Sequence, residues 1–120
     1  MNKEELLGRT RQFAVKVFKL IERFPKSKAA DVVAYQLLKS SSSVAANFRA
    51  VNKAKSKNDF INKMKIVLEE SDESNFWLTF IEDIQLIKVD SDLKFLIKES
   101  DEFVAIFTSA IKTLNQKSKI

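Results

Sequence analysis

The sequence predicts an all-α protein, folded as an antiparallel up-down-up-down four-helix bundle in a single domain over residues 1–120. One Gly and one Pro occur in the whole chain, whereas sheets and barrels need many turns, and turns depend on these residue types. Apolar side chains recur at helical spacing through four long segments. The connections between these segments are short, which favours antiparallel neighbours.

The first two expected helices cover residues 3–24 and 27–51. Pro25 ends the first helix, because its ring disfavours helical geometry at Phe24 and it lacks a backbone N–H. Ser27 is a suitable N-cap for the second helix. Four serines at 40–43 lie inside the second helix, but the apolar period continues across them. We therefore expect one uninterrupted helix whose small side chains let a neighbouring helix approach closely.

The third and fourth expected helices cover residues 57–87 and 92–115, with residues 116–120 expected to fray. Ser56 is the expected N-cap of the third helix, and Asp59 lies in its first turn, where a negative charge meets the helix dipole favourably. The apolar positions of the third helix cover more than one stripe; they are Phe60, Met64, Val67, Leu68, Phe76, Trp77, Phe80, Ile81, Ile84 and Ile87. A helix in a monomeric bundle buries one face, so the surplus predicts a contact with another subunit.

Charge is sorted along the chain. Residues 1–65 contain fifteen Lys and Arg against five Asp and Glu, whereas residues 69–102 contain three Lys against eleven Asp and Glu. The net charge of the whole chain is +5. This sorting predicts two surfaces of opposite sign, which can attract a polyanion, contact other copies of the same chain, or do both.

The composition argues against several classes of function. The chain has no Cys, which removes disulfides, thiolate catalysis and Cys-based zinc sites, and favours an intracellular setting. It has no His, the usual general base near neutral pH and the commonest metal ligand. We see neither a signal peptide nor an apolar run long enough to span a membrane. We therefore expect a cytoplasmic protein that is not an enzyme, needs no cofactor or metal, and does not bind membranes.

A basic cluster surrounds the connection between the second and third helices. Its members are Arg49, Lys53, Lys55, Lys57, Lys63 and Lys65, and Asp59 is the one opposing charge among them. Such clusters bind phosphate backbones through counterion release, with little sequence specificity. We assign nucleic-acid contacts to Arg49, Lys53, Lys55, Lys57 and Lys63. The alternative is a solvated connection that only keeps the protein soluble.

Other polar and aromatic features have structural interpretations beside functional ones. The first helix has a second basic stripe (Arg9, Arg11, Lys16, Lys19 and Arg23), but its apolar face is needed for the core rather than for a membrane. The acidic run 69–73 could hold Mg²⁺ or Ca²⁺, although a helix face that pairs with Lys or Arg is favoured. Trp77 could stack on nucleobases, but its spacing favours the core or an interface. Asn47 lies among apolar residues, so we expect it to bond Ser43 or Thr10.

Several of these segments resemble a known family. Phe24-Pro25 is followed by Tyr35-Gln36-Leu37-Leu38-Lys39-Ser40, and then by Ser43-Val44-Ala45-Ala46-Asn47-Phe48. After the basic connection come Ser56, Phe60, Met64 and the acidic residues 69–74. Together with the start at residues 9–14, this pattern is similar to the bacterial four-helix-bundle proteins encoded in intervening sequences of 23S rRNA genes. The resemblance covers about residues 8–115.

The resemblance implies a four-helix bundle that assembles into a ring, commonly a pentamer. It also implies a relationship to the accessory protein of diversity-generating retroelements, which binds nucleic acid and a reverse transcriptase. No enzymatic activity is established for the family. This chain departs from the family at one place, since many members follow the Ala-Asn with Ile-Ala-Glu-Gly, whereas here Asn47 is followed by Phe48-Arg49-Ala50-Val51. The change removes a helix-ending Gly and adds a positive charge.

We therefore predict a non-catalytic, oligomeric protein that binds the phosphate backbone of RNA or DNA, with RNA favoured. The alternative is a protein-interaction scaffold that docks a nucleoprotein or a reverse-transcriptase-like partner without binding RNA itself.

Overall fold

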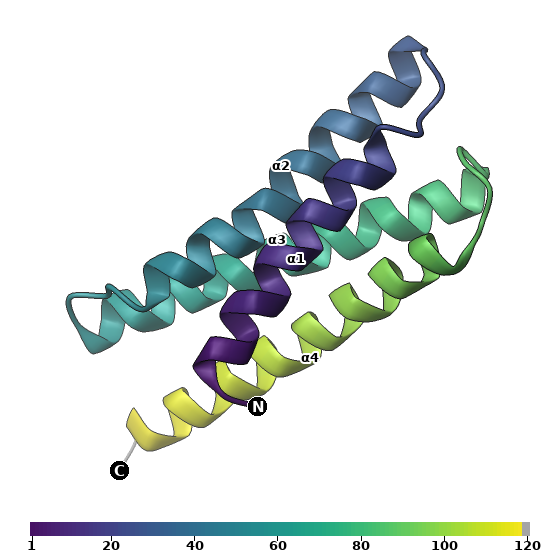
Figure 1. Cartoon of the computed structure of the whole chain (residues 1–120). Helices are drawn as coiled ribbons and strands as arrows, with labels where there is room; N and C mark the ends of the chain where they lie inside the picture. Colours follow the sequence, from purple (N-terminus) through teal and green to yellow (C-terminus); the bar gives the residue numbers. More distant parts are fainter. Residues whose placement is uncertain (119–120) are drawn as a thin grey trace.

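The computed structural model describes residues 1–118, which form four helices: α1 (Lys3–Ile21), α2 (Lys28–Val51), α3 (Lys57–Ile84) and α4 (Ser91–Ser118). No strand occurs among these residues, so the all-α prediction is confirmed. The helices pack lengthwise into an elongated bundle of 52 × 22 × 21 Å. The α1–α2 and α3–α4 connections lie toward one end, and the α2–α3 connection lies at the other (Figure 1).

A continuous apolar core runs between the four helices. Its largest fully buried side chains are Phe13 of α1, Leu37 of α2, Leu78 and Ile81 of α3, and Phe103 and Phe107 of α4. Phe13 and Phe103 meet edge to face, with ring centroids 5.3 Å apart. Each helix packs against two neighbours in the order α1, α2, α3, α4, and the contact between α4 and α1 is the least extensive.

Each helix begins at a side-chain cap. Ser27 Oγ accepts the N–H of Ala30 at 3.1 Å, and Ser56 Oγ accepts the N–H of Asp59 at 3.1 Å, which confirms both predicted caps. Asn2 and Asp90 do the same for α1 and α4. A capping side chain satisfies a backbone donor that has no partner within the helix, so these residues fix where the helices start.

Three helix ends differ from the prediction. The structure ends α1 at Ile21 rather than residue 24, because the N–H groups of Arg23 and Phe24 already bond carbonyls three residues back, in tighter turns that precede Pro25. Helix α3 ends at Ile84 rather than 87, because Gln85 is left-handed (φ 51°) and the Leu86 N–H bonds the Ile81 carbonyl at 3.2 Å. This reversal turns Ile87 into the core.

Helix α4 continues through residues 116–118, where no helix-breaking residue occurs, so the expected fraying of these residues is wrong. Residues 119–120 lie outside the described part.

The serine run of α2 lies inside the bundle against α3. Ser40 and Ser41 of α2 and Ser71 and Ser74 of α3 are buried. The Ser74 hydroxyl donates to Ser40 Oγ at 3.0 Å and to the Glu70 carbonyl of its own helix at 2.8 Å. The predicted close approach at the serine run is confirmed. Asn47 donates to the carbonyl and hydroxyl of Ser43 at 2.9 and 2.8 Å, which confirms the first of its two predicted partners.

Candidate nucleic-acid interface

The α2–α3 connection is held by its own hydrogen bonds. The N–H groups of Lys53 and Ala54 bond the last carbonyls of α2, at Ala50 and Val51. On the other side, Asp59 Oδ2 accepts the N–H of Lys55 at 3.0 Å. The backbone that carries the basic side chains is therefore fixed, while the side chains themselves project from it.

The structure separates the predicted basic residues into two groups. Arg49, Lys53, Lys55 and Lys57 are exposed and form no ion pair with any carboxylate of residues 1–118. Lys63 is half-buried, and its Nζ lies 2.5 Å from Asp59 Oδ1. This bond from Lys63, together with the Lys55 N–H, holds the pKa of Asp59 below its usual value. Lys63 is thus partly neutralised, and four of the five predicted contact residues keep an uncompensated charge.

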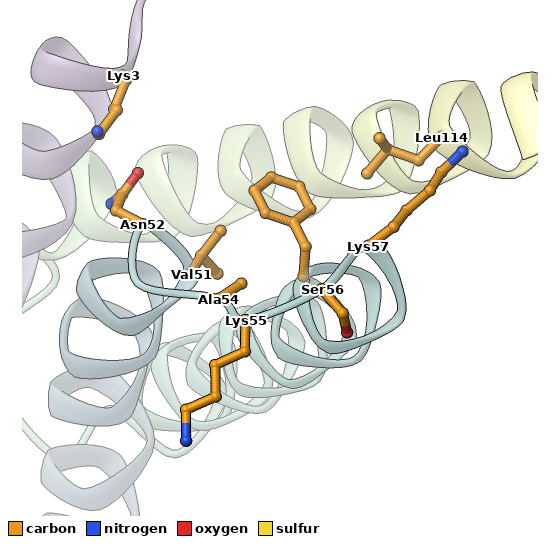
Figure 2. A pocket seen from close by; sticks show the side chains of 9 residues that line it. Lys3, Val51, Asn52, Ala54, Lys55, Ser56, Lys57 and Leu114 are labelled. Atoms are coloured by element: carbon orange, nitrogen blue, oxygen red, sulfur yellow. The ribbon is translucent and has the colours of Figure 1, made fainter.

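Two of these four cations, Lys55 and Lys57, border a shallow hollow of about 570 Å³ at this end of the bundle. Its floor is apolar and includes Val51, Phe60 and Leu114. Lys57 extends toward Leu114 of α4, whereas Lys55 points away from it, and Lys3 approaches from α1 (Figure 2). The cations therefore spread over the end of the bundle, as a surface suited to several phosphates rather than one.

Sequence reasoning missed Lys3, which lies about fifty positions before the basic cluster in the chain. The expected helix order could have located Lys3 at this end of the bundle. If successive helices reverse direction, the start of the first helix lies beside the connection between the second and third. The exposed Lys112 on α4 belongs to the same half of the molecule by the same reasoning.

The exposed face of α3 is acidic and apolar. Ile66, Phe76, Phe80 and Ile84 are exposed on it, and the rings of Phe76 and Phe80 stack with centroids 6.0 Å apart. Trp77 packs edge-on against both rings and against the core, as its spacing predicted. Its indole N–H is buried and has no hydrogen-bond partner within residues 1–118.

The expected pairing of the acidic run with Lys or Arg does not take the form of direct ion pairs within residues 1–118. None of the carboxylates at 69–73 forms an ion pair with a described cation. Burial and the nearby Glu73 charge raise the pKa of Glu70. In the described part of the chain, no group of three or more Asp and Glu side chains is arranged to hold a metal ion.

Most cations of the basic stripe of α1 contact other residues of the same chain. Arg9 bonds Glu99 through two nitrogens and also bonds Glu102 at 2.6 Å, and the Glu99 contact is the main cause that raises the pKa of Arg9. Arg23 bonds Asp90 at 2.6 Å. Lys16 lies over the ring of Phe95, 4.2 Å from its centroid. Arg11 and Lys19 stay exposed, without an ion pair to residues 1–118.

Comparisons of the sequence with protein families and of the structure with solved structures each give a match. Residues 3–109 match the model of the 23S rRNA-intervening sequence protein family. The chain belongs to this family. It is also similar to the crystal structure of a protein of unknown function from the S23 ribosomal protein family of Bacteroides thetaiotaomicron, with 28% identity and a TM-score of 0.82. That match covers 93% of this chain and 99% of the other.

Comparison with curated proteins gives no significant match. Among the described helices of this family member, none is both long and apolar enough to cross a bilayer.

Proposed function

We propose that this family member is a non-catalytic, oligomeric RNA-binding protein of the cytoplasm. One observation carries the proposal: Arg49, Lys53, Lys55 and Lys57 are exposed at one end of the bundle without a carboxylate partner in the described chain. A cation that is already paired gains little from a phosphate, whereas an unpaired one releases the counterions of the nucleic acid. In this proposal RNA is bound through its backbone and with little sequence preference.

Self-assembly multiplies these contacts. The proposed helix order is up-down-up-down, which puts Lys3 beside the basic connection and leaves one exposed face on each helix. On α3 that face includes stacked aromatic rings, and the nearby carboxylates at 69–73 form no ion pair with residues 1–118. Such a face suits contact with a basic surface of the next subunit, and repeated head-to-tail contacts close into a ring, here proposed to be a pentamer. Repetition of the basic end around the ring adds weak phosphate contacts together.

The RNA-binding proposal is tested by charge reversal. The triple variant Lys53→Glu, Lys55→Glu, Lys57→Glu should lower affinity for a single-stranded RNA oligonucleotide at least about tenfold and flatten its salt dependence. Fluorescence anisotropy at several salt concentrations measures both quantities. Because Glu at position 57 lies in the first turn of α3, the substitution there suits the helix dipole and should not unfold the bundle.

A matched control changes the same amount of charge elsewhere. Lys39 of α2 and Lys94 and Lys98 of α4 are exposed and lie away from the α2–α3 connection, and reversing all three to Glu gives the same net charge as the test variant. This control should keep most of the RNA affinity and its salt slope. Equal losses in the two variants would mean that total charge, not the α2–α3 end, attracts RNA.

The scaffold function is favoured by one observation, the exposed aromatic face of α3, behind which the Trp77 N–H has no hydrogen-bond partner within residues 1–118. In this function a partner protein would bind the exposed aromatic face of α3, either in place of a second copy of the chain or beside it. Pull-down with and without nuclease treatment separates the two functions. Partners that survive nuclease digestion, together with failure of purified protein to bind RNA, would favour the scaffold.

A further inference from the structure

A groove separates α1 from α4 at the end of the bundle opposite the basic connection. It has a volume of about 580 Å³ and is lined by Lys16, Lys19, Leu20 and Arg23 of α1 and by Ser91, Asp92, Phe95 and Leu96 of α4. The contact between these two helices is the least extensive in the bundle. Leu20 and Leu96, at 2% and 0% exposure, belong to the buried core beneath it. A volume of this size fits a ligand of one or two rings.

The two walls of the groove differ in chemistry. Lys16, Lys19 and Arg23 line the α1 wall, one turn apart. The α4 wall presents the ring of Phe95, which is 45% exposed, and the oxygens of Ser91 and Asp92. Arg23 is largely satisfied by Asp90, and Asp92 lies 3.4 Å from Arg23 with 76% of its side chain exposed. Lys16 and Lys19 have no carboxylate partner within residues 1–118.

This arrangement has separate places for the two halves of one ligand. An anionic group is attracted to Lys16 and Lys19 on the first wall, and Lys16 then leaves the Phe95 ring that its ammonium group covers in the free protein. A planar apolar group can pack on Phe95, and amino groups on its edge can donate to Asp92 and Ser91 on the second wall. An acidic peptide would satisfy the first wall, but its carboxylates would face Asp92 on the second. A nucleotide combines a phosphate, a flat base and exocyclic amino donors.

We propose that the α1–α4 groove binds one nucleotide, with the phosphate at Lys16 and Lys19 and an amino-bearing base against Phe95 and Asp92. In this binding mode Lys16 moves from the Phe95 ring face to the phosphate, and the base takes its place. The nucleotide is either free in solution or the terminal unit of an RNA chain. The groove is separate from the α2–α3 end, so it gives base contacts that the phosphate-binding end lacks.

The direct test is titration of the full-length protein with adenosine 5′-monophosphate, followed by calorimetry and by amide NMR shifts. Shifts should cluster at residues 16–23 and 91–96. Adenosine and ribose 5-phosphate each supply one half of the ligand, and each should bind at least about tenfold more weakly. Equal binding of ribose 5-phosphate, or shifts scattered over all basic surfaces, would overturn the proposal.

Variants assign the two walls. Phe95→Ala should weaken adenosine 5′-monophosphate about tenfold, because it removes the stacking surface. It should not weaken ribose 5-phosphate, because Lys16, released from the ring, stays available to the phosphate. The double variant Lys16→Glu, Lys19→Glu should abolish the response to both phosphates. Phe18→Ala, at an exposed aromatic position of α1 outside the groove, is the matched control and should bind normally. Circular dichroism checks that each variant keeps its helices; a folded Phe95→Ala protein with unchanged affinity would contradict the assignment.

Two further comparisons identify the source of the nucleotide and separate this proposal from the proposed function. A short oligoadenylate with a 5′-phosphate should compete with the mononucleotide if RNA ends are bound, and a free nucleotide alone should bind if they are not. The triple variant Lys53→Glu, Lys55→Glu, Lys57→Glu should keep its affinity for adenosine 5′-monophosphate. Loss of long-RNA binding in that variant with no mononucleotide binding in the wild type would refute the groove and leave the RNA-binding end intact.

Discussion

The α2–α3 and α1–α4 contacts close the same bundle by different means. Between α2 and α3, small hydroxyl side chains let the helices approach, and the Ser74–Ser40 bond at 3.0 Å lies in the buried contact. Between α4 and α1, long charged side chains reach across, from Arg9 to Glu99 and from Arg23 to Asp90. Close packing leaves no room for a ligand, whereas a contact bridged by extended side chains leaves a groove between its bridges.

The difference has an energetic side. Protein interiors are packed as densely as organic crystals, so a buried position between two helices tolerates little added volume. An ion pair at the surface contributes less, because water screens it and the long side chains lose conformational freedom. We therefore expect substitutions in the α2–α3 contact to have the largest effects on the free energy of unfolding, and those in the α1–α4 contact to have smaller ones.

The largest effect is expected from Ser40→Leu. Ser40 is fully buried against α3, so a leucine there forces the helices apart and removes the bond from Ser74. Overpacking of this kind should cost about 3 kcal/mol of unfolding free energy. Urea unfolding at fixed protein concentration measures the loss. Ser42→Leu, at an exposed position of the same serine run, is the control and should change stability little. Equal effects would mean that the serine run does not set the helix spacing.

An intermediate effect is expected from Arg9→Ala in the α1–α4 contact. The guanidinium is the partner of Glu99, whose side chain is 11% exposed, so its removal leaves a nearly buried carboxylate without its ion pair. The expected loss is about 1.5 kcal/mol. Arg11→Ala removes an exposed arginine without an ion pair in the described chain and should have almost no effect.

A double-mutant cycle identifies the cause of that loss. When Glu99→Gln is present, the charge that needed a partner is gone, so Arg9→Ala should cost less than in the wild type. An unchanged cost would contradict the Arg9–Glu99 pair as the cause. It would point instead to the Arg9–Glu102 pair or to the packing of Arg9 over the Phe103 ring, whose centroid lies 5.3 Å from the guanidinium carbon.

The contacts also differ in how much of them the sequence could predict. Local signals were sufficient for Ser27 and Ser56, because a cap depends on residues within one turn of itself. The serine run predicted a close approach of helices, since its size and its place in the apolar period are both visible in the chain. The end of α3 was missed because Gln85 adopts a left-handed conformation that Gly usually supplies, in order to bury Ile87.

The candidate sites show the same limit. The basic cluster at 49–65 lies in one short stretch of sequence around a connection, so its position at one end of the bundle could be predicted. Its member Lys63 could not be discounted from sequence. An (i, i+4) pair with Asp59 competes with an external phosphate, but the sequence does not show whether the two side chains adopt the rotamers that form it. The α1–α4 groove was not predictable, since it depends on where two helices more than sixty residues apart in the chain diverge.

The smallest effect is expected from Asp90→Asn, and it concerns pH. Asp90 caps α4 by accepting the Leu93 N–H at 3.1 Å and pairs with Arg23, and these bonds, the cap first, hold its pKa below the usual value. A carboxylate whose folded pKa is depressed contributes stability that is present above its unfolded pKa of about 4 and is lost as the pH falls through the folded value. Because Asn is also a good N-cap, the substitution removes mainly the charge.

The wild type should therefore be slightly more stable than the Asp90→Asn variant at pH 6, and this advantage should be smaller at pH 3. Urea midpoints at the two pH values measure it. Asp72→Asn, at an exposed position in the middle of α3, is the control. Its difference in stability from the wild type should not shrink between pH 6 and pH 3 through loss of a cap or an Arg23 pair. If the Asp90→Asn difference were as large at pH 3 as at pH 6, the Arg23–Asp90 pair would not stabilise the α1–α4 contact through charge. The groove beside it would then be held open by the helix ends alone.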